Sequence, residues 1–247
     1  MLNVLIPMSG PNRFDGDEFS YPKPLIEIMG RPVIEHVIAG LDQIRRQKRF
    51  ICVVNEEDCD NFYLADVLGL ITKGNVQCIK LKRSTKGAAC SALMAIDYID
   101  NDGPLLISNS DHVLEWDLDA ILDRFDSRKV DAGVVCFEAV HPKWSYVRLD
   151  EAGKIVETAE KRPLSRYAIA GLYYFRRGAD FVRAARCSIE KDASVNGLYY
   201  IAPVMNELIL EGANLESVSV PASAYHNFYS PHKLREYEAY LSSKSAP

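Results

Sequence analysis

The sequence contains no long hydrophobic run and no compact metal-binding motif. Nowhere do about 18 apolar residues follow one another, as a membrane-spanning helix requires, and the first residues lack the basic segment of a signal peptide. The 6 cysteines form no C-x-x-C pair, and the 5 histidines show no ligand spacing. We therefore expect a cytoplasmic protein that has no zinc site and no membrane partner, with most cysteines buried as small core residues.

The chain also lacks a strong excess of charge of either sign. Its 29 Lys and Arg residues against 34 Asp and Glu residues give a formal net charge of −5, which argues against a nucleic-acid partner. A phosphate pocket is compatible with this balance, because it needs only a few well-placed cations. With 48% apolar and 26% charged residues, the composition excludes disorder and fibrous repeats. The length of 247 residues favours one large domain and leaves the oligomeric state open.

The first half of the chain alternates short β-branched runs with longer segments of helical periodicity. This alternation is typical of βα units and predicts an α/β fold with a Rossmann-like, mainly parallel sheet flanked by helices. Strands are predicted at 2–6, 50–54, 76–81 and 104–108, and helices over 57–70, 87–99 and 117–125. A further helix is predicted to begin at Pro32, which would occupy its first turn.

After residue 130 the predicted strands lie closer together in the sequence. Runs at 130–137, 145–149, 154–158 and 168–175 predict strands, and the turn at 150–153 predicts a hairpin. Helices over 179–189 and 200–211, a strand at 215–220 and a helix from Pro231 complete the chain. We expect an antiparallel element inserted in one domain spanning 1–247, with a nucleotide-binding part at about 1–129 and an acceptor part at about 130–247.

Polar side chains follow three of these strands, at the sheet edge where open parallel sheets bind ligands. Arg13 lies in a loop with Gly10, although neither G-x-G-x-x-G nor G-x-x-x-x-G-K-[ST] occurs. Lys23 stands between two prolines, which predicts an extended and stiff backbone that would present its ammonium to a phosphate. A solvated surface lysine is the alternative.

The other two loops contain acidic residues. Asp111 ends an apolar strand, where it would hold Mg²⁺ together with phosphate oxygens or, alternatively, cap the next helix. Glu160 to Arg162 places a carboxylate beside two cations, as a second anion clamp or as a solvated turn. Trp144 and Tyr146 would stack on a sugar ring or simply pack in the core.

In their order along the chain, these segments resemble the sugar-1-phosphate nucleotidyltransferase family, which makes nucleotide-activated sugars, including those for capsule and surface polysaccharide. The family has a Gly-rich loop ending in Arg and then a proline-flanked lysine, as at 9–14 and 21–25 here. Residues 86–92 are similar to its G-T-A-x-A segment, and Asp111 matches its strand-end aspartate. Residues 160–161 and 170–175 look like its E-K-P and A-G-I-Y-x-F segments.

The resemblance implies a GT-A-like fold and a Mg²⁺-dependent reaction. A nucleoside triphosphate would couple to a sugar-1-phosphate or a related phosphomonoester, and pyrophosphate would leave. Arg13 and Lys23 would be catalytic, and Asp111 would hold the metal. The nucleotide would contact Met8, Ser9, Gly10, Gly87, Ala88 and Asn109. The acceptor would contact Glu160, Lys161, Gly171, Asn196 and Tyr199.

Two departures from the family pattern keep other functions open. The first loop is about one residue shorter than the family's, with Pro11 and Asn12 where further glycine is expected. Asn227 stands where some members have a second metal-binding Asp, and asparagine is a weaker ligand for Mg²⁺. A non-catalytic nucleotide-binding subunit is therefore one alternative. A nucleotide-sugar-dependent glycosyltransferase is another, with Asp117 to Asp119 as its D-x-D motif, although Asp117 is better placed as a helix N-cap.

Overall fold

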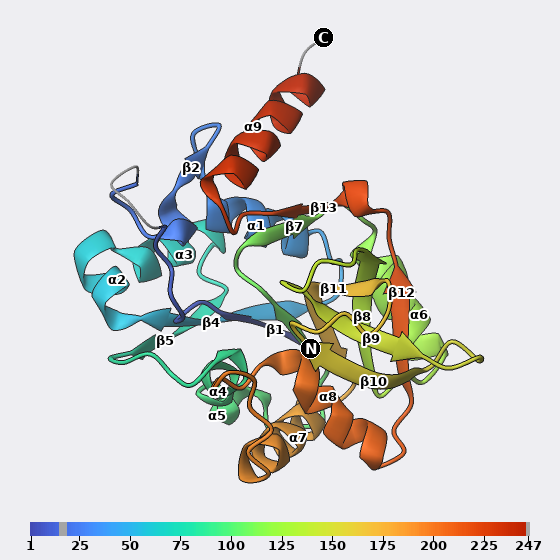
Figure 1. Cartoon of the computed structure of the whole chain (residues 1–247). Helices are drawn as coiled ribbons and strands as arrows, with labels where there is room; N and C mark the ends of the chain where they lie inside the picture. The colour runs from blue at the N-terminus through green and yellow to red at the C-terminus, as the bar shows by residue number, and fades with distance from the viewer. Residues whose placement is uncertain (15–18, 246–247) are drawn as a thin grey trace.

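The computed structural model describes residues 1–14 and 19–245. In these residues a nine-stranded sheet forms the centre of the molecule (Figure 1). Its strands are β1 (Leu2–Pro7), β4 (Lys48–Asn55), β5 (Val76–Leu81), β6 (Leu105–Ser108), β8 (Ala132–Glu138), β9 (Ser145–Leu149), β10 (Ile155–Glu160), β11 (Tyr167–Phe175) and β12 (Leu215–Ser219). Two short ribbons pair β2 (Glu27–Ile28) with β3 (Arg31–Pro32), and β7 (His112–Leu114) with β13 (Tyr225–Asn227).

The helices cover both faces of the sheet (Figure 1). They are α1 (Val33–Asp42), α2 (Glu56–Phe62), α3 (Leu64–Ile71), α4 (Ala88–Leu93), α5 (Ile96–Ile99), α6 (Leu118–Ser127), α7 (Gly178–Glu190), α8 (Ile201–Leu210) and α9 (Pro231–Ser245). The short 3-10 helices are η1 (Lys23–Leu25) and η2 (Ala222–Ala224). Among the described residues, the structure contains no helix that is long and apolar enough to cross a membrane.

The sheet has a parallel part and an antiparallel part, as predicted. Strands β5, β4, β1 and β6 lie side by side and parallel. Strand β11 is antiparallel to β6, β8 and β9, and the predicted hairpin joins β9 to β10. The sheet is therefore continuous from the first half of the chain into the second, and the boundary between the two parts lies at the β6–β11 pair.

Alternate side chains of the central strands pack into two cores, one on each face of the sheet. On β1, Val4 and Ile6 contact the core under α1 and α6, whereas Leu5 contacts the core under α4, α7 and α8. All three side chains are fully buried. Burying one such side chain stabilises the fold by roughly 1.5–3 kcal/mol, so both layers of helices are held to the sheet by apolar burial.

Two predicted helices are each divided in the structure. The helix predicted over 57–70 is broken at Tyr63, whose φ of +56° is left-handed and cannot continue a right-handed helix. The helix predicted over 87–99 is divided into α4 and α5 at Ala95. Hydrophobic periodicity shows which positions are apolar, but it does not report a single residue with an unusual backbone conformation.

Two expectations about prolines were wrong. Pro32 is the N-cap of α1 and ends β3, so it precedes the first helical turn. Lys23 is not extended, because it begins the 3-10 helix η1, and the extended residue is Pro22 with φ −63° and ψ 149°. Pro24 is tolerated as the second residue of η1, since the first turn of a helix needs no backbone N–H from it.

Candidate active site

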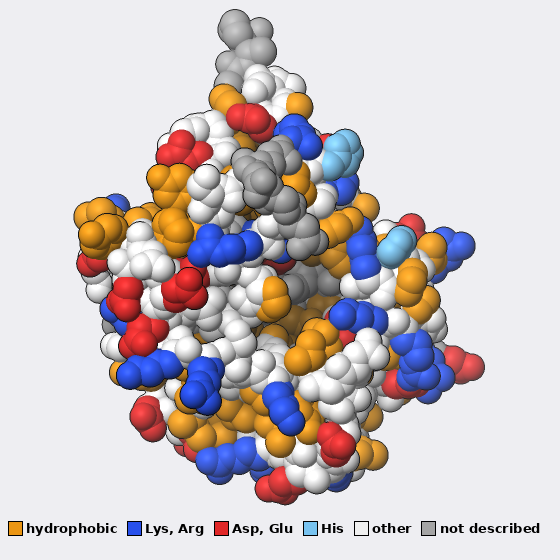
Figure 2. Space-filling model, turned by 60° about the vertical axis from the view of Figure 1, so that its left-hand side comes forward, with side chains coloured by type: hydrophobic (Ala, Val, Ile, Leu, Met, Phe, Trp, Pro, Cys, Tyr) orange, Lys and Arg blue, Asp and Glu red, His pale blue; other side chains and the backbone are white. Residues whose placement is uncertain are grey.

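Two cavities meet at the carboxyl ends of β1 and β6, and they share Asn109 and Asp111. The first, which we name the loop cavity, has a volume of about 200 Å³ and is lined by Pro7, Met8, Gly10, Pro11, Asn12, Lys23, Pro24, Ala88, Asn109, Ser110 and Asp111. The second, the aromatic cavity, has about 300 Å³ and is lined by Asn109, Asp111, Lys143, Trp144, Ser145, Glu160, Ile169, Gly171, Tyr173, Tyr225, Asn227 and Tyr229. Figure 2 shows a hollowed face, with hydrophobic side chains in the hollow and Lys and Arg side chains around it.

Lys23 enters the loop cavity from a segment that is bonded to the first loop. The N–H of Lys23 donates to the carbonyl of Asn12 at 2.5 Å, which ties the lysine segment to the first loop. The ammonium of Lys23 lies 4.6 Å from the centre of the Phe14 ring. Prolines at 22 and 24 flank it. Lys23 therefore lines the cavity from a braced segment, although that segment is a 3-10 turn and not the extended backbone that was predicted. Its role toward a phosphate stays a prediction.

Arg13 does not line either cavity. Its guanidinium lies 3.5 Å from the carboxylate of Asp58 and 5.1 Å from the centre of the Phe62 ring. Asp58 is 2% exposed and also accepts hydrogen bonds from Asn12 and Asn55. This buried carboxylate on α2 therefore connects the first loop to the helix layer. Asp58 was not predicted as a site residue, because a single acidic residue at the start of a helix is common.

The start of α4 closes the loop cavity on another side. Ser9 is buried, and its hydroxyl pairs with that of Ser91 at 2.9 Å. Gly87 has φ +109°, and a Cβ at this position would overlap the carbonyl oxygen of Tyr199. That oxygen accepts the N–H of Ala89 at 3.0 Å. Ser9 and Gly87 thus hold the wall of the loop cavity in place, while Ala88 lines it.

Gly171 of the aromatic cavity packs against Asn109, which lines both cavities. The N–H of Asn109 donates to the carbonyl of Gly171 at 3.0 Å. Gly171 has φ +69°, and a Cβ there would lie 2.7 Å from Nδ2 of Asn109 and 3.2 Å from Cε1 of His112. Only glycine allows this approach of β11 to β6 without displacing the Asn109 side chain.

Glu160, at the end of β10, contributes a carboxylate to the aromatic cavity in addition to that of Asp111. Burial raises the pKa of Glu160, while a hydrogen bond from Ser145 and the charge of Lys161 act to lower it. Tyr173, from β11, lines the same wall. These polar groups come from three neighbouring strands, so the sheet itself sets their spacing.

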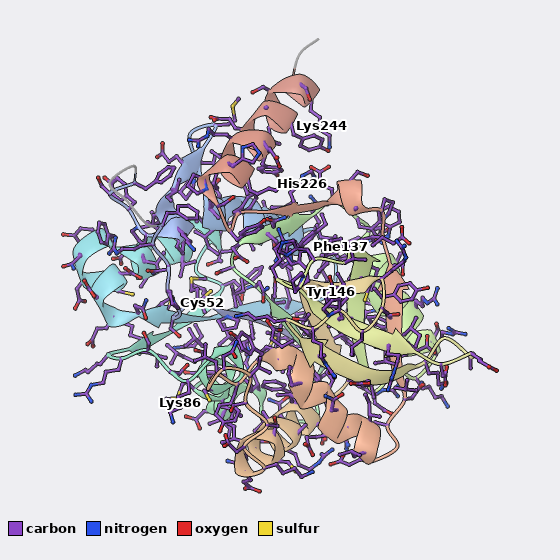
Figure 3. The ribbon with its side chains drawn as sticks, in the orientation of Figure 1. Cys52, Lys86, Phe137, Tyr146, His226 and Lys244 are labelled. Atoms are coloured by element: carbon purple, nitrogen blue, oxygen red, sulfur yellow. The ribbon has the colours of Figure 1, made fainter. Side chains whose placement is uncertain are left out.

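Aromatic rings make up the opposite wall. Tyr225 stacks on Phe137 with ring centres 4.5 Å apart, and Trp144 meets Tyr225 edge-on at 5.7 Å. Tyr229 lies edge-on to Trp144 at 5.9 Å. For Trp144 and Tyr146 the sequence allowed either stacking on a sugar ring or packing in the core. Trp144 lines the cavity, whereas Tyr146 is fully buried in the core near Phe137 (Figure 3).

The ribbon of β7 and β13 separates this wall from α9. Tyr225 and Asn227 line the aromatic cavity, whereas His226 between them lies toward α9, with its ring 4.5 Å from that of Tyr240 (Figure 3). The N–H of Phe228 donates to the carbonyl of Asp111 at 2.7 Å. The ribbon, which the sequence analysis did not predict, thus brings residues near 225–229 beside Asp111.

Three residues predicted to bind the acceptor lie outside the aromatic cavity. Lys161 has φ +55°, and its ammonium donates to the hydroxyl of Tyr200 at 2.9 Å. The hydroxyl of Tyr199 donates to Asp192 at 2.7 Å, and Asn196 lies in a tight turn with φ +53°. Their roles in binding stay predictions. Lys143, which the sequence analysis did not single out, lines the cavity instead.

Asp111 and Asn227 offer two oxygen ligands to a cation. Burial raises the pKa of Asp111, and the charge of Lys23 opposes this shift. Oδ1 of Asn227 is buried and has no hydrogen-bond partner in the structure. Hard oxygen donors suit Mg²⁺, which is usually held by one or two protein groups together with substrate phosphates. Among the described residues no group of three or more His, Cys, Asp or Glu could hold a metal ion. Asp111 and Asn227 both line the aromatic cavity, and their side-chain oxygens are donors of the kind that suits Mg²⁺.

A larger cavity, of about 880 Å³, lies between α1, β7 and α9 and contains none of the residues predicted for the nucleotidyltransferase site. Its wall includes Asp117 and Asp119. Asp117 accepts the N–H of Ala120 at 3.0 Å, which confirms it as the N-cap of α6. Asp119 is bound by Arg45 through Nε at 2.9 Å. Both carboxylates of the D-x-D sequence therefore have structural partners, which argues against a glycosyltransferase metal site.

Comparison with known proteins matches the chain to one protein family and to two curated relatives. A family model described as nucleotidyl transferase matches residues 19–214. The bifunctional protein GlmU of Methanocaldococcus jannaschii is 28% identical over 158 residues, which cover 62% of this chain and 35% of that protein. Mannose-1-phosphate guanylyltransferase 1 of Arabidopsis thaliana is 25% identical over 191 residues, covering 73% of this chain and 53% of that protein. The chain thus spans about a third and about a half of these curated relatives.

Among solved structures, a nucleoside-diphosphate-sugar pyrophosphorylase from Vibrio cholerae RC9 superimposes with a TM-score of 0.84. The match covers 96% of this chain and 99% of that one, at 23% sequence identity. At this identity the likeness establishes the shared fold. The parallel sheet, the antiparallel part and the surrounding helices are therefore an arrangement that a protein of different sequence also adopts.

Proposed function

Because the chain belongs to the nucleotidyl transferase family, we propose that it couples a nucleoside triphosphate to a sugar-1-phosphate or a related phosphomonoester. One observation carries the proposal: the loop cavity and the aromatic cavity meet at Asn109 and Asp111. Two substrates bound in the two cavities would have their phosphates side by side. The product would be a nucleotide-activated precursor, for which surface polysaccharide is the expected destination.

In the proposed reaction, an oxygen of the acceptor phosphate forms a bond to the α-phosphorus of the triphosphate. The bond from that phosphorus to the bridging oxygen breaks, and pyrophosphate leaves with the electron pair. No covalent bond to the protein is needed, so positioning and charge neutralisation supply the rate acceleration. Lys23 would neutralise the triphosphate in the loop cavity. Arg13, which lies in the first loop and forms an ion pair with Asp58, would add a second positive charge near the triphosphate.

We further propose that Asp111 and Asn227 hold Mg²⁺. The unpartnered Oδ1 of Asn227 and the carboxylate of Asp111 line one cavity and supply the oxygen donors that this ion prefers. When bound, the ion would supply Lewis-acid neutralisation of the phosphate oxygens. Burial raises the pKa of Asp111, and the positive charge of Lys23 opposes that rise and so favours the ionised carboxylate.

The aromatic cavity would bind the body of the acceptor. Rings of Trp144 and Tyr225 offer apolar faces, while Glu160 and Ser145 offer groups that accept and donate hydrogen bonds. Sugar rings present both kinds of surface, which is why such a mixed wall suits a sugar phosphate. The name of one relative, mannose-1-phosphate guanylyltransferase 1, contains a sugar-1-phosphate. The acceptor of this chain has to be identified by experiment.

A pyrophosphate-release screen tests the proposal. The five common triphosphates CTP, UTP, dTTP, GTP and ATP are paired with a panel of sugar-1-phosphates and other phosphomonoesters, with and without Mg²⁺. We expect one pair to release pyrophosphate in a Mg²⁺-dependent reaction. Release of no pyrophosphate from any pair, in the presence of nucleotide binding, would instead identify a nucleotide-binding subunit.

A metal-site variant sharpens the screen. Asp111→Ala should abolish the Mg²⁺-dependent rate, because it removes the charged ligand, while Asp60→Ala on the exposed side of α2 should leave that rate unchanged. Retention of the wild-type rate by Asp111→Ala would contradict the assigned metal site. Sugar transfer without pyrophosphate would contradict the reaction itself.

A further inference from the structure

We propose that Lys143 binds the phosphate of the acceptor and that Trp144 and Tyr229 position its ammonium. The inference rests on the proposed function, and it assigns a residue that the sequence analysis did not select. It starts from the charges of the aromatic cavity. Among the described residues lining this cavity, Asp111 and Glu160 are acidic and Lys143 alone is basic. A phosphomonoester brought into such a cavity needs a protein cation beside it.

Lys161, the residue that the resemblance selects, is occupied elsewhere. Its ammonium donates to the hydroxyl of Tyr200 at 2.9 Å and lies 5.1 Å from the centre of that ring. The backbone of Lys161 does reach the cavity wall, because its N–H donates to the carbonyl of Trp144 at 3.0 Å. Lys161 therefore braces the segment that presents Lys143, while its own charge points to Tyr200.

The ammonium of Lys143 is held by rings. It lies 4.5 Å from the centre of the Trp144 ring and 4.0 Å from that of Tyr229, and it donates a hydrogen bond to the Tyr229 hydroxyl. Cation–π contacts of this kind attract the charge without neutralising it. An ammonium has three N–H donors, so Lys143 keeps donors for a phosphate oxygen while the rings hold it in place.

The turn that carries Lys143 is held by two hydrogen bonds to the carbonyl of His141. The hydroxyl of the buried Tyr146 donates to the carbonyl of His141 at 2.8 Å. The N–H of Trp144 donates to the same carbonyl at 3.3 Å. Lys143 thus starts from an anchored main chain, and little conformational entropy remains to be lost when it binds a ligand.

Tyr229 connects Lys143 to the segment that contacts Asp111. The N–H of Phe228 donates to the carbonyl of Asp111 at 2.7 Å, and Tyr229 is the next residue. The Lys143 ammonium, bonded to the Tyr229 hydroxyl, lines the same cavity as Asp111, which also lines the loop cavity. The junction of the two cavities is where the acceptor phosphate must sit to reach the triphosphate. Glu160 and Tyr173, on neighbouring strands, are left for the body of the acceptor.

Steady-state kinetics with the substrate pair found in the screen test the proposal. We expect Lys143→Gln to raise the KM for the acceptor at least 10-fold and to leave the KM for the triphosphate within twofold of wild type. Lys143→Arg should restore most of the affinity, and Tyr229→Phe, which keeps the ring, should have a smaller effect than Lys143→Gln. Lys80→Gln, on an exposed edge position of β5, is the matched control. An unchanged acceptor KM in Lys143→Gln would overturn the assignment. So would a large rise in the acceptor KM that occurs in Lys161→Gln and not in Lys143→Gln.

A binding experiment separates this proposal from the proposed function. Calorimetry with inorganic phosphate is done on Lys23→Ala, which lacks the cation of the loop cavity, and on Lys23→Ala with Lys143→Gln. We expect phosphate binding in the single variant and at least a 10-fold weaker affinity in the double variant, whether or not any pair releases pyrophosphate. Equal phosphate affinity in both variants, or none in either, would refute a phosphate site at Lys143.

Discussion

The two cavities that meet at Asp111 are built in different ways. Residues of the loop cavity all lie between positions 7 and 111, and proline and small residues make up just over half of its lining. The aromatic cavity draws most of its residues from after position 130, with four aromatic rings and the charges of Lys143 and Glu160. A wall of small residues suits a group common to all nucleoside triphosphates, because it lets the ligand approach the main chain closely. A wall of large side chains can discriminate among acceptors, because each ring or charged group contacts a different part of the ligand.

The two regions also differ in what holds them rigid. The loop cavity is fixed by main-chain hydrogen bonds, such as the one from Lys23 to Asn12, and by the buried Asp58. In the aromatic cavity the rings brace one another at centre distances of 4.5 to 5.9 Å. We therefore expect substitutions in the first region to affect the triphosphate and those in the second to affect the acceptor. The following variants test that division, from the largest expected effect to the smallest.

Lys23→Ala should have the largest effect. Loss of a charge that neutralises the transition state typically costs about 100-fold or more in turnover, and no other lysine lines the loop cavity among the described residues. The kcat for pyrophosphate release measures it, with Lys80→Ala as the control. If only the KM for the triphosphate changed, Lys23 would be a binding residue, and the chemistry would depend on other groups.

Gly171→Ala should damage both regions at once, because Gly171 packs against Asn109, which lines both cavities. The added Cβ would lie 2.7 Å from Nδ2 of Asn109, so we expect both KM values to rise severalfold. Gly153→Ala is the matched control, since φ is +78° there but no atom lies within 4 Å of the added Cβ. Both variants should lose about 1 kcal/mol of stability from backbone strain, which thermal unfolding measures. A change in only one KM would show that the junction is not shared.

Asp58→Asn should affect the loop cavity alone. It removes the charge that pairs with Arg13 while keeping a side chain of the same shape. We expect the KM for the triphosphate to change by about threefold to 10-fold, as for a buried charged hydrogen bond worth roughly 1 kcal/mol, and the acceptor KM to stay constant. Asp60→Asn, exposed on the same helix, is the control. An equal change in both KM values would contradict the division into two regions.

Asp180→Asn should leave both cavities unchanged and alter only the acid stability of the scaffold. Burial raises the pKa of Asp180, but hydrogen bonds from Arg177 and Arg183 outweigh this effect and lower the pKa below its ordinary value. The stabilisation is therefore complete above the unfolded pKa of about 3.9 and is lost as the pH falls through the folded pKa. The Tm advantage of wild type over the variant should be present at pH 6 and shrink at pH 3. An advantage independent of pH would point to packing.

The residues that line the loop cavity were easier to predict from the sequence than those that line the aromatic cavity. Lys23 and Asp111 were selected because they lie in loops that follow parallel strands, whose carboxyl ends meet at one edge, and both line the loop cavity. Glu160 was selected in the same way from a charged loop after a strand, whereas Asn109, Gly171 and Asn227 were selected through the family resemblance; all four line the aromatic cavity. Lys143 was missed, because nothing in a Lys-Trp pair on a turn distinguishes a cavity wall from a solvated surface.

The sequence by itself determined the α/β class, the nine strands of the central sheet and the two sets of loops that approach one edge of it, but not the strands of the two short ribbons. These follow from apolar periodicity and turn residues, which are local properties. Only the tertiary structure decided that Tyr63 breaks a helix, that Asp58 holds Arg13, and that the β7–β13 ribbon carries Asn227 to Asp111. Each of these depends on groups that are far apart in the chain or on a single residue's backbone conformation. Contacts of that kind are set by how the layers pack, and no local pattern encodes them.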